Sequence, residues 1–138
     1  FNLSPVGEHF VQLCGTTPCW LRGADDLKDV CRKMIGEQGD ITEDGKLSWL
    51  EVECLGACVN APMVQINDDY FEDLDYMSMS DLIDRLNEDD VPAAGSIRGR
   101  QGSQPEPAPT SLTNVVDFPA SSVKSSSKPK AGKGDDHA

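Results

Sequence analysis

The sequence predicts an α/β domain with a mixed sheet and helices on both faces over residues 1–90, followed by an extended or disordered C-terminal tail over residues 91–138. Short runs rich in β-branched and aromatic residues recur along the domain, and two segments carry apolar residues at helical spacing. From Val91 onward Pro, Gly, Ser and Lys predominate and no apolar periodicity remains. At 138 residues the chain has room for one domain and an appendage.

The first half of the domain is expected to form a strand, a cysteine-containing loop and a helix. Residues 9–13 are apolar enough for a strand buried on both faces, and Gly15 and Pro18 then break the strand. A helix is predicted over residues 24–35, with acidic residues in its first turn and basic residues in its last. Its apolar stripe consists of Leu27, Val30, Cys31, Met34 and Ile35. Because Cys31 lies on this stripe without a second cysteine at ligand spacing, we assign it to the core.

The second half is expected to form three strands and a closing helix. Strands are predicted over residues 47–53, 63–66 and 70–74, and residues 67–69 form a hairpin turn. Ser78 is the expected N-cap of the closing helix. The buried face of that helix consists of Met79, Leu82, Ile83 and Leu86. The predicted element order is therefore β-α-β-β-β-α.

Charge and composition argue against several classes of function. Residues 1–90 hold 20 Asp and Glu against 6 Lys and Arg, a net charge of −14. Such a domain repels phosphates, so neither nucleic acid nor an anionic membrane surface is expected as a partner. No apolar run approaches the roughly 20 residues needed to span a bilayer, so no direct membrane insertion is expected. Five cysteines, an odd number, favour a reducing compartment over a disulfide framework.

Four of the cysteines form two tight pairs, Cys14 with Cys19 and Cys54 with Cys58. Each pair follows a predicted strand in a short glycine-containing loop, so four thiolates can converge and hold a soft metal centre. A thiol–disulfide catalyst of thioredoxin type would need two residues between its cysteines, and the first pair has four. The gaps of four and three residues disfavour a four-cysteine zinc site, which remains open as part of an adaptor domain. No pattern of a complete active site, such as Ser-His-Asp or a phosphate-binding glycine motif, is present.

Two stretches around these cysteines resemble a known family. Cys14-Gly-Thr-Thr-Pro-Cys-Trp-Leu-Arg-Gly23 and Glu51-Val-Glu-Cys-Leu-Gly-Ala-Cys-Val-Asn-Ala-Pro-Met-Val64 are similar to the small iron–sulfur subunit of NADH:quinone oxidoreductase (complex I). The resemblance implies a thioredoxin-like fold and a cis peptide bond before Pro62. It also implies one 2Fe–2S cluster, with the ligands Cys14, Cys19, Cys54 and Cys58.

The resemblance further implies a one-electron carrier that exchanges electrons with the FMN of a neighbouring NADH-oxidising flavoprotein. FMN and NADH would then bind that partner and not this chain, and other complex I subunits would also be partners. An equivalent diaphorase subunit of an NAD-linked hydrogenase or formate dehydrogenase is the related alternative. The expected location is the peripheral arm, on the cytoplasmic face of a bacterial inner membrane or on the mitochondrial matrix side. Family members usually carry a helical segment before this point, whereas this sequence begins without Met.

Part of the predicted tail also carries the resemblance. Residues 95–118 resemble the extended arm with which complex I small subunits lie along the flavoprotein, and disorder is expected beyond residue 118. An anchoring contact is expected at the apolar residues Leu112, Val115, Val116 and Phe118.

Residues next to the cysteines have expected supporting roles. Gly15 and Gly56 would let backbone N–H groups approach sulfur, which raises the reduction potential of a cluster, whereas the charges of Glu51 and Glu53 would lower it. Trp20 and Trp49 are expected to pack around the two loops.

Overall fold

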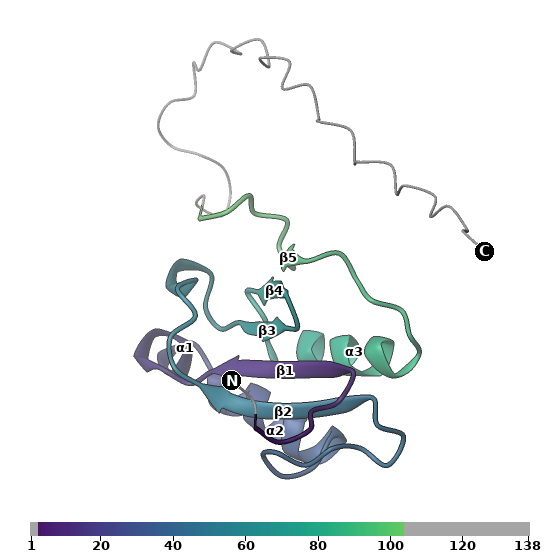
Figure 1. Ribbon diagram of the computed structural model, residues 1–138. Coiled ribbons are helices and arrows are strands. Elements are labelled where there is room, and N and C mark those ends of the chain that lie inside the picture. Colours follow the sequence, from purple (N-terminus) through teal and green to yellow (C-terminus); the bar gives the residue numbers. More distant parts are fainter. Residues whose placement is uncertain (1–2, 104–138) are drawn as a thin grey trace, which may run out of the picture.

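The computed structural model describes residues 3–103 of the chain. The strands form one five-stranded sheet in the order β2-β1-β3-β4-β5, which Figure 1 shows from β2 upward to β5. Among the described residues, no helix is both long and apolar enough to cross a membrane. The elements in chain order are β1 (His9–Cys14), α1 (Thr17–Leu21), α2 (Ala24–Met34), β2 (Leu47–Val52), the 3-10 helix η1 (Cys58–Asn60), β3 (Val64–Ile66), β4 (Asp69–Glu72), α3 (Tyr76–Asn87) and β5 (Gly95–Ser96).

The sheet is mixed, as the sequence predicts. β1 and β2 are parallel because α2 connects them as a crossover, whereas β3 runs antiparallel to both β1 and β4. The register between β1 and β2 places Cys14 opposite Val52. Both strands therefore finish at the same end of the sheet, and the two cysteine loops leave it next to each other.

Both long helices pack on one face of the sheet, whereas the sequence analysis expects helices on both faces. α2 and α3 contact each other, and the Lys33 ammonium of α2 lies 3.3 Å from the Tyr76 hydroxyl of α3. In Figure 1 both helices lie behind the sheet. The reason is the alternation along β1, where Val11 and Leu13 are fully buried and Gln12 between them is only half-buried.

Among the described residues, the opposite face of the sheet carries neither of the two long helices. The residues that precede β1 lie over it, and Leu3 and Val6 line a groove together with Phe10 and Leu50. One apolar face therefore binds both helices, and the other is covered by an extended segment.

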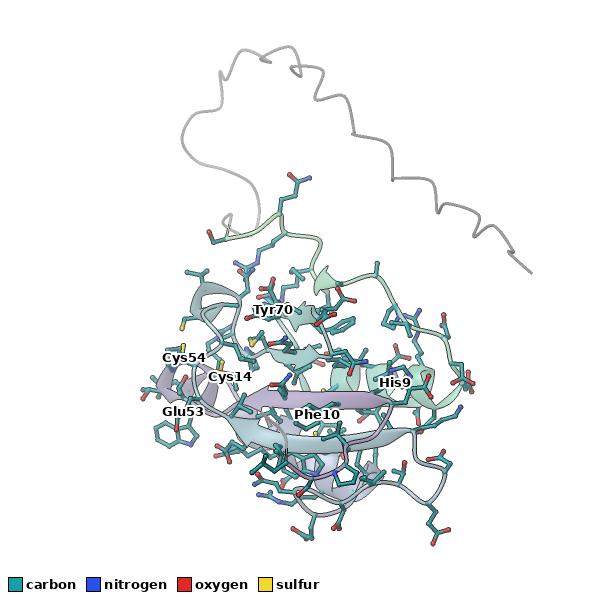
Figure 2. The ribbon with its side chains drawn as sticks, in the orientation of Figure 1. His9, Phe10, Cys14, Glu53, Cys54 and Tyr70 are labelled. Atoms are coloured by element: carbon teal, nitrogen blue, oxygen red, sulfur yellow. The ribbon has the colours of Figure 1, made fainter. Side chains whose placement is uncertain are left out.

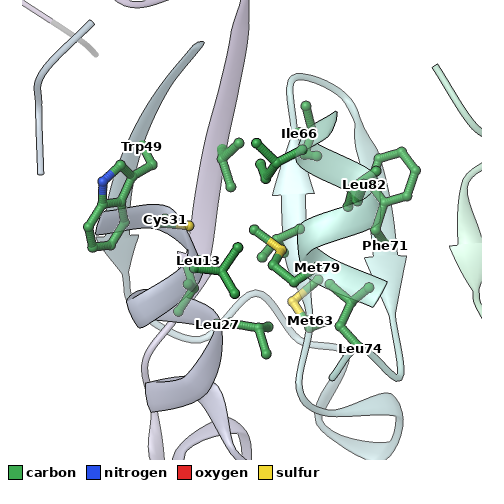
Figure 3. Close-up of a cluster of buried hydrophobic side chains, with 14 of the residues drawn as sticks. Leu13, Leu27, Cys31, Trp49, Met63, Ile66, Phe71, Leu74, Met79 and Leu82 are labelled. Atoms are coloured by element: carbon green, nitrogen blue, oxygen red, sulfur yellow. The ribbon is translucent and has the colours of Figure 1, made fainter. Parts of the chain in front are cut away.

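The core lies between the sheet and the two helices, as Figure 3 shows. Cys31 is fully buried among apolar side chains, which confirms its assignment to the core, and burial raises the pKa of its thiol to about 12. Trp49 is fully buried as well, and its indole Nε1 donates to the Gly36 carbonyl at 2.8 Å. Apolar side chains thus form a continuous core between the sheet and the two helices.

The closing helix begins earlier than predicted. Asp75, and not Ser78, is the N-cap residue of α3, because the Asp75 carboxylate accepts a hydrogen bond from the Ser78 N–H at 2.8 Å. Ser78 completes a capping box, since its hydroxyl accepts from the Asp75 N–H at 2.8 Å. The Ala61–Pro62 peptide bond is cis, as predicted.

Three elements were not predicted: α1, the 3-10 helix η1 and β5. α1 forms in the segment expected to be a loop, with Pro18 in its first turn, where a proline is tolerated because no helical N–H is needed. β5 lies in the predicted tail and pairs in parallel with β4. The predicted arm over residues 95–118 falls within the described residues only up to residue 103, and the four predicted anchoring residues lie outside them.

Candidate metal centre

The two cysteine loops meet at the end of β1 and β2. The Gly15 N–H donates to the Val52 carbonyl at 3.1 Å, so the first loop starts beside the last residue of β2. Cys54 follows two residues later, and Figure 2 shows Cys14 and Cys54 close together at this end of the sheet. The parallel pairing of two strands thus brings together thiols that are 40 residues apart in the sequence.

The first pair of cysteines is buried and held by regular structure. Cys14 is the last residue of β1 and Cys19 lies in α1, and their exposed fractions are 2% and 1%. The Thr16 carbonyl accepts the Trp20 N–H at 2.9 Å, which closes the turn that carries Cys19. One sulfur is therefore fixed by the sheet and the other by a helix that packs beside it.

The second pair is exposed and lies in irregular structure. Cys54 follows β2 without regular secondary structure, and Cys58 is the first residue of η1. Their Sγ atoms are 3.5 Å apart. The hydroxyl of Tyr70, labelled in Figure 2, donates to the Leu55 carbonyl at 2.7 Å and so ties this loop to β4.

Backbone N–H groups and a hydroxyl point at the sulfur of Cys14. Burial favours its neutral thiol, but hydrogen bonds from the Thr16 hydroxyl and from the Leu55 and Thr16 N–H groups lower the pKa of Cys14 overall. The Thr16 Oγ1 lies 3.4 Å from the Cys14 Sγ. Because Leu55 belongs to the second loop, both loops help to stabilise a thiolate of the first.

Hydrogen bonds and burial also shift the pKa values of the other three thiols, one downward and two upward. The Gly56 N–H lowers the pKa of Cys54, with further hydrogen bonds from Cys58 and Thr16, whereas the hydrogen bond to Cys54 raises the pKa of Cys58. Burial raises the pKa of Cys19 to about 12, and the Cys14 thiol acts in the same direction. Within each pair, the pKa of one thiol is therefore lowered and the pKa of the other is raised.

Cys14 acts electrostatically on the other three predicted site residues. The charge of Cys14 raises the pKa of Cys19 and of Cys58, and it opposes the lowering of the pKa of Cys54. The thiols are arranged as two pairs, and that all four hold one metal centre stays a prediction. Within residues 3–103, no three Cys, His, Asp or Glu side chains are grouped so that they could hold a metal ion by themselves.

The donor set suits a 2Fe–2S cluster. Such a cluster takes two thiolates on each iron, and the chain offers two thiol pairs. N–H groups directed at cluster sulfurs are the usual means of stabilising its negative charge, and the loops provide them at Leu55, Gly56 and Met63. The residues present therefore fit this group.

The glycines of the two loops have different physical roles. A Cβ on Gly15 would lie 1.9 Å from the Glu51 carboxylate, which forms an ion pair with Lys28 at 2.8 Å. Gly56 has a φ of +86°, and a Cβ there would meet nothing within 4 Å. A side chain at residue 15 would thus displace the flexible Glu51 side chain, whereas Gly56 is favoured by its left-handed backbone.

Trp20 and Trp49 differ in burial, although both were expected to pack around the loops. Trp20 is 54% exposed, and its indole Nε1 donates to Asp25 at 3.0 Å, so that expectation is wrong for Trp20. Leu21 and Val59 are exposed by 71% and 67%. Leu21 ends α1, which carries Cys19, and Val59 follows Cys58 in η1, so both exposed apolar side chains lie close in sequence to cysteines.

Sequence reasoning missed the residues that brace the second loop from a distance. Arg100 donates to the Val59 carbonyl at 3.2 Å, and the Asn60 amide donates to the Gly102 carbonyl at 2.6 Å. Both contacts span about 40 residues, and no local pattern in the sequence announces them.

Comparison with known proteins agrees with the resemblance found in the sequence. Residues 1–87 match the family described as thioredoxin-like 2Fe-2S ferredoxin. An NADH-quinone oxidoreductase subunit of Rickettsia bellii is 56% identical over 90 residues, covering 64% of this chain and 54% of that protein, and the protein of the same name from Rickettsia conorii has the same values. The chain therefore spans about half the length of these curated relatives.

A solved structure supports the fold. The crystal structure of an NAD+-reducing NiFe hydrogenase in the H2-reduced state matches with a TM-score of 0.58 and 20% identity, over 65% of this chain and 16% of that chain. With the family match, this similarity confirms the predicted thioredoxin-like fold with its mixed sheet.

Proposed function

This chain belongs to the thioredoxin-like 2Fe-2S ferredoxin family, and on that premise we propose that it carries single electrons on a 2Fe–2S cluster. The proposed ligands are the four clustered thiols, Cys14, Cys19, Cys54 and Cys58. One observation carries the proposal: two thiol pairs converge where β1 and β2 end, with backbone N–H groups directed at sulfur.

Residues of this chain would bind the cluster and determine its reduction potential. We propose that Cys14 and Cys19 bind one iron and that Cys54 and Cys58 bind the other, because the members of each pair are close together in the sequence. When bound, the cluster supplies reversible one-electron chemistry. The N–H groups of the loops favour the reduced state, whereas the acidic charge of the domain disfavours it, so a low reduction potential is expected.

The proposed setting is the peripheral arm of NADH:quinone oxidoreductase. The identity with the rickettsial subunits of that enzyme supports this setting, and the chain would then exchange electrons with the FMN of a partner NADH-oxidising flavoprotein. NADH and FMN would bind that partner. The arm would lie on the cytoplasmic face of a bacterial inner membrane or on the mitochondrial matrix side.

An equivalent diaphorase subunit of an NAD-linked hydrogenase or formate dehydrogenase would use the same fold. At 20% identity the hydrogenase match supports the fold alone, so the more similar relatives favour the complex I setting.

Colour and composition test the cluster directly. The full chain, purified without oxygen, is expected to absorb visible light, to contain iron and acid-labile sulfide in a ratio of about one, and to give a paramagnetic signal after one-electron reduction. A colourless protein that retains zinc would instead support the four-cysteine zinc adaptor.

Copurification tests the partner and the predicted arm. The full chain is expected to copurify with an FMN-containing, NADH-oxidising protein. Deletion of residues 104–138 keeps every described residue, so it should spare the cluster. It removes most of the predicted arm, so it should weaken the association with the partner. Unchanged association after the deletion would contradict a role of those residues in binding the partner.

A further inference from the structure

The segment after α3 returns to the sheet and then reaches the second cysteine loop. We call residues 95–103 the strap. Its first two residues form β5 beside β4, and the Ile97 N–H donates to the Glu72 carbonyl at 3.1 Å. In Figure 1 the chain beyond β5 runs toward the loop that joins β2 to β3. The strap thus connects the far edge of the sheet with the loop that carries Cys54 and Cys58.

A buried ion pair holds the strap in place. The Asp73 side chain is 3% exposed and the Arg100 side chain 13%, and the Arg100 Nε lies 3.0 Å from the Asp73 carboxylate. The Ser96 hydroxyl donates to the same carboxylate. Burial alone would raise the pKa of Asp73, but the hydrogen bonds from Arg100 and Ser96 lower it. The pair is therefore ionised and well satisfied, unlike an exposed surface pair.

Two further contacts transmit this anchoring to the cysteine loop. Arg100 also donates through Nη2 to the carbonyl of Val59, the residue after Cys58, at 3.2 Å. The buried Asn60 donates to the Gly102 carbonyl at 2.6 Å and to Glu72 at 2.9 Å. The two residues after Cys58 are thus held by the strap from one side.

The loop that carries Cys54 and Cys58 contains little regular secondary structure. η1 has three residues, and Cys54 lies outside any helix or strand. Both thiols are exposed, so packing against the core does not fix them. A loop in this situation depends on hydrogen bonds from other parts of the chain to keep its sulfurs in one place.

We propose that Arg100, anchored by Asp73, is a positioning residue that holds Cys58 in the geometry the cluster needs. The inference rests on the proposed function, because Cys58 must be a ligand for its position to matter. Arg100 acts on Cys58 through the carbonyl of the neighbouring Val59. Its loss frees the carbonyl after Cys58 and leaves the Asp73 carboxylate buried without its main partner.

The test compares two arginine–aspartate pairs in the full chain. Arg100→Gln removes the strap's ion pair, and Arg85→Gln removes the exposed pair with Asp90, in which Arg85 Nε lies 2.8 Å from the carboxylate. Arg85 lies in the last turn of α3, and its side chain bonds to Asp90 just beyond that helix. We expect an iron chelator to bleach the visible absorption of Arg100→Gln about tenfold faster than that of the wild type. The Arg85→Gln protein should bleach at the wild-type rate.

Two further measurements distinguish positioning from general destabilisation. The visible circular dichroism of the cluster and its reduction potential should shift in Arg100→Gln and not in Arg85→Gln, because only the first changes the surroundings of a ligand. Arg100→Lys keeps one donor and the charge, so it should bleach at an intermediate rate. If Arg100→Gln fails to fold, this lysine variant carries the test.

The possible outcomes are separable. Equal bleaching rates for Arg100→Gln and Arg85→Gln, or faster bleaching of Arg100→Gln with wild-type dichroism and potential, would overturn the positioning role and leave the proposed function standing. A wild-type chain that binds no cluster would overturn the proposed function, and the inference with it.

Discussion

The two cysteine pairs stand at the same end of the sheet but in opposite surroundings. Cys14 and Cys19 are buried in a strand and a helix, whereas Cys54 and Cys58 are exposed in an irregular loop. The first pair belongs to the core of the domain. The second pair depends on Tyr70 and on the strap, which come from later parts of the chain.

The comparison shows how one small domain can both protect a metal centre and give access to it. A buried pair keeps water away from half of the proposed cluster, and an exposed pair leaves the other half within reach of a partner. The exposed apolar side chains Leu21, in α1, and Val59, in η1, belong to the elements that carry Cys19 and Cys58. We therefore expect electron exchange to take place at the side of the second pair.

The largest effect should come from replacing ligands in each pair. Alanine at any of the four positions is expected to abolish the visible absorption of the cluster. In the cluster-free protein, replacements in the two pairs should differ in their effect on the free energy of unfolding. Cys19→Ala removes a buried side chain and should lower the free energy of unfolding of the cluster-free protein by about 1 kcal/mol, whereas Cys58→Ala should change it by less than about 0.5 kcal/mol. Visible spectra and urea unfolding measure the two effects, and equal losses of stability would contradict the difference in burial.

The support of the second pair should depend on pH through Asp73. Its folded-state pKa lies below the ordinary 3.8, so its ionised form stabilises the fold above that pH, and this contribution is lost as the pH falls through the folded-state pKa. Asp73→Asn should lower the free energy of unfolding by about 3 kcal/mol at neutral pH, because it removes the negative charge that faces Arg100 in a buried site.

The difference between Asp73→Asn and the wild type should shrink in acid, where the wild-type carboxyl is protonated too. Urea unfolding of the cluster-free protein across this range measures it. Asp90→Asn, in an exposed pair, is the matched control and should stay close to the wild type at each pH. A constant difference between Asp73→Asn and the wild type would exclude the ionised pair as the cause.

Gly15 and Gly56, one beside each pair, should differ in why their replacement lowers the free energy of unfolding. Gly15→Ala should lower the free energy of unfolding by about 2 kcal/mol, because the new Cβ displaces Glu51 from Lys28. Gly56→Ala should lower it by about 1 kcal/mol through backbone strain alone. Adding Glu51→Ala should relieve most of the Gly15→Ala defect and none of the Gly56→Ala defect. Double-mutant cycles by urea unfolding test this, and additive effects for Gly15 and Glu51 would refute the predicted clash.

The fifth cysteine, Cys31, belongs to neither pair, and its replacement should have no effect on the cluster. Cys31→Ala should keep the cluster spectrum and lower the free energy of unfolding by about 1 kcal/mol, since it removes one buried sulfur from the core. Visible absorption and urea unfolding check both statements. Loss of the cluster in this variant would require a different set of ligands.

Local patterns in the sequence were sufficient for much of the fold. The apolar stripe of α2 contains buried residues at the predicted positions, and the β-rich runs became β1 to β4. α1 was missed, although Thr16 followed by Pro18 is a pattern typical of a helix start. β5 could not be found, because two residues, Gly95 and Ser96, carry no strand signal. The sequence predicts the N-cap of α3 at Ser78, whereas Asp75 has that position in the structure, and Ser78 is the third residue of the helix.

The sequence by itself determined that cysteines occur as two pairs, because four or five positions of chain keep the members of a pair close in any fold. It also determined the resemblance that implies a cluster. Only the tertiary structure decided that the two pairs meet, since this depends on the parallel register of β1 with β2. It also decided which pair is buried and that Arg100 braces the second loop, because burial and long-range hydrogen bonds depend on segments far apart in the chain.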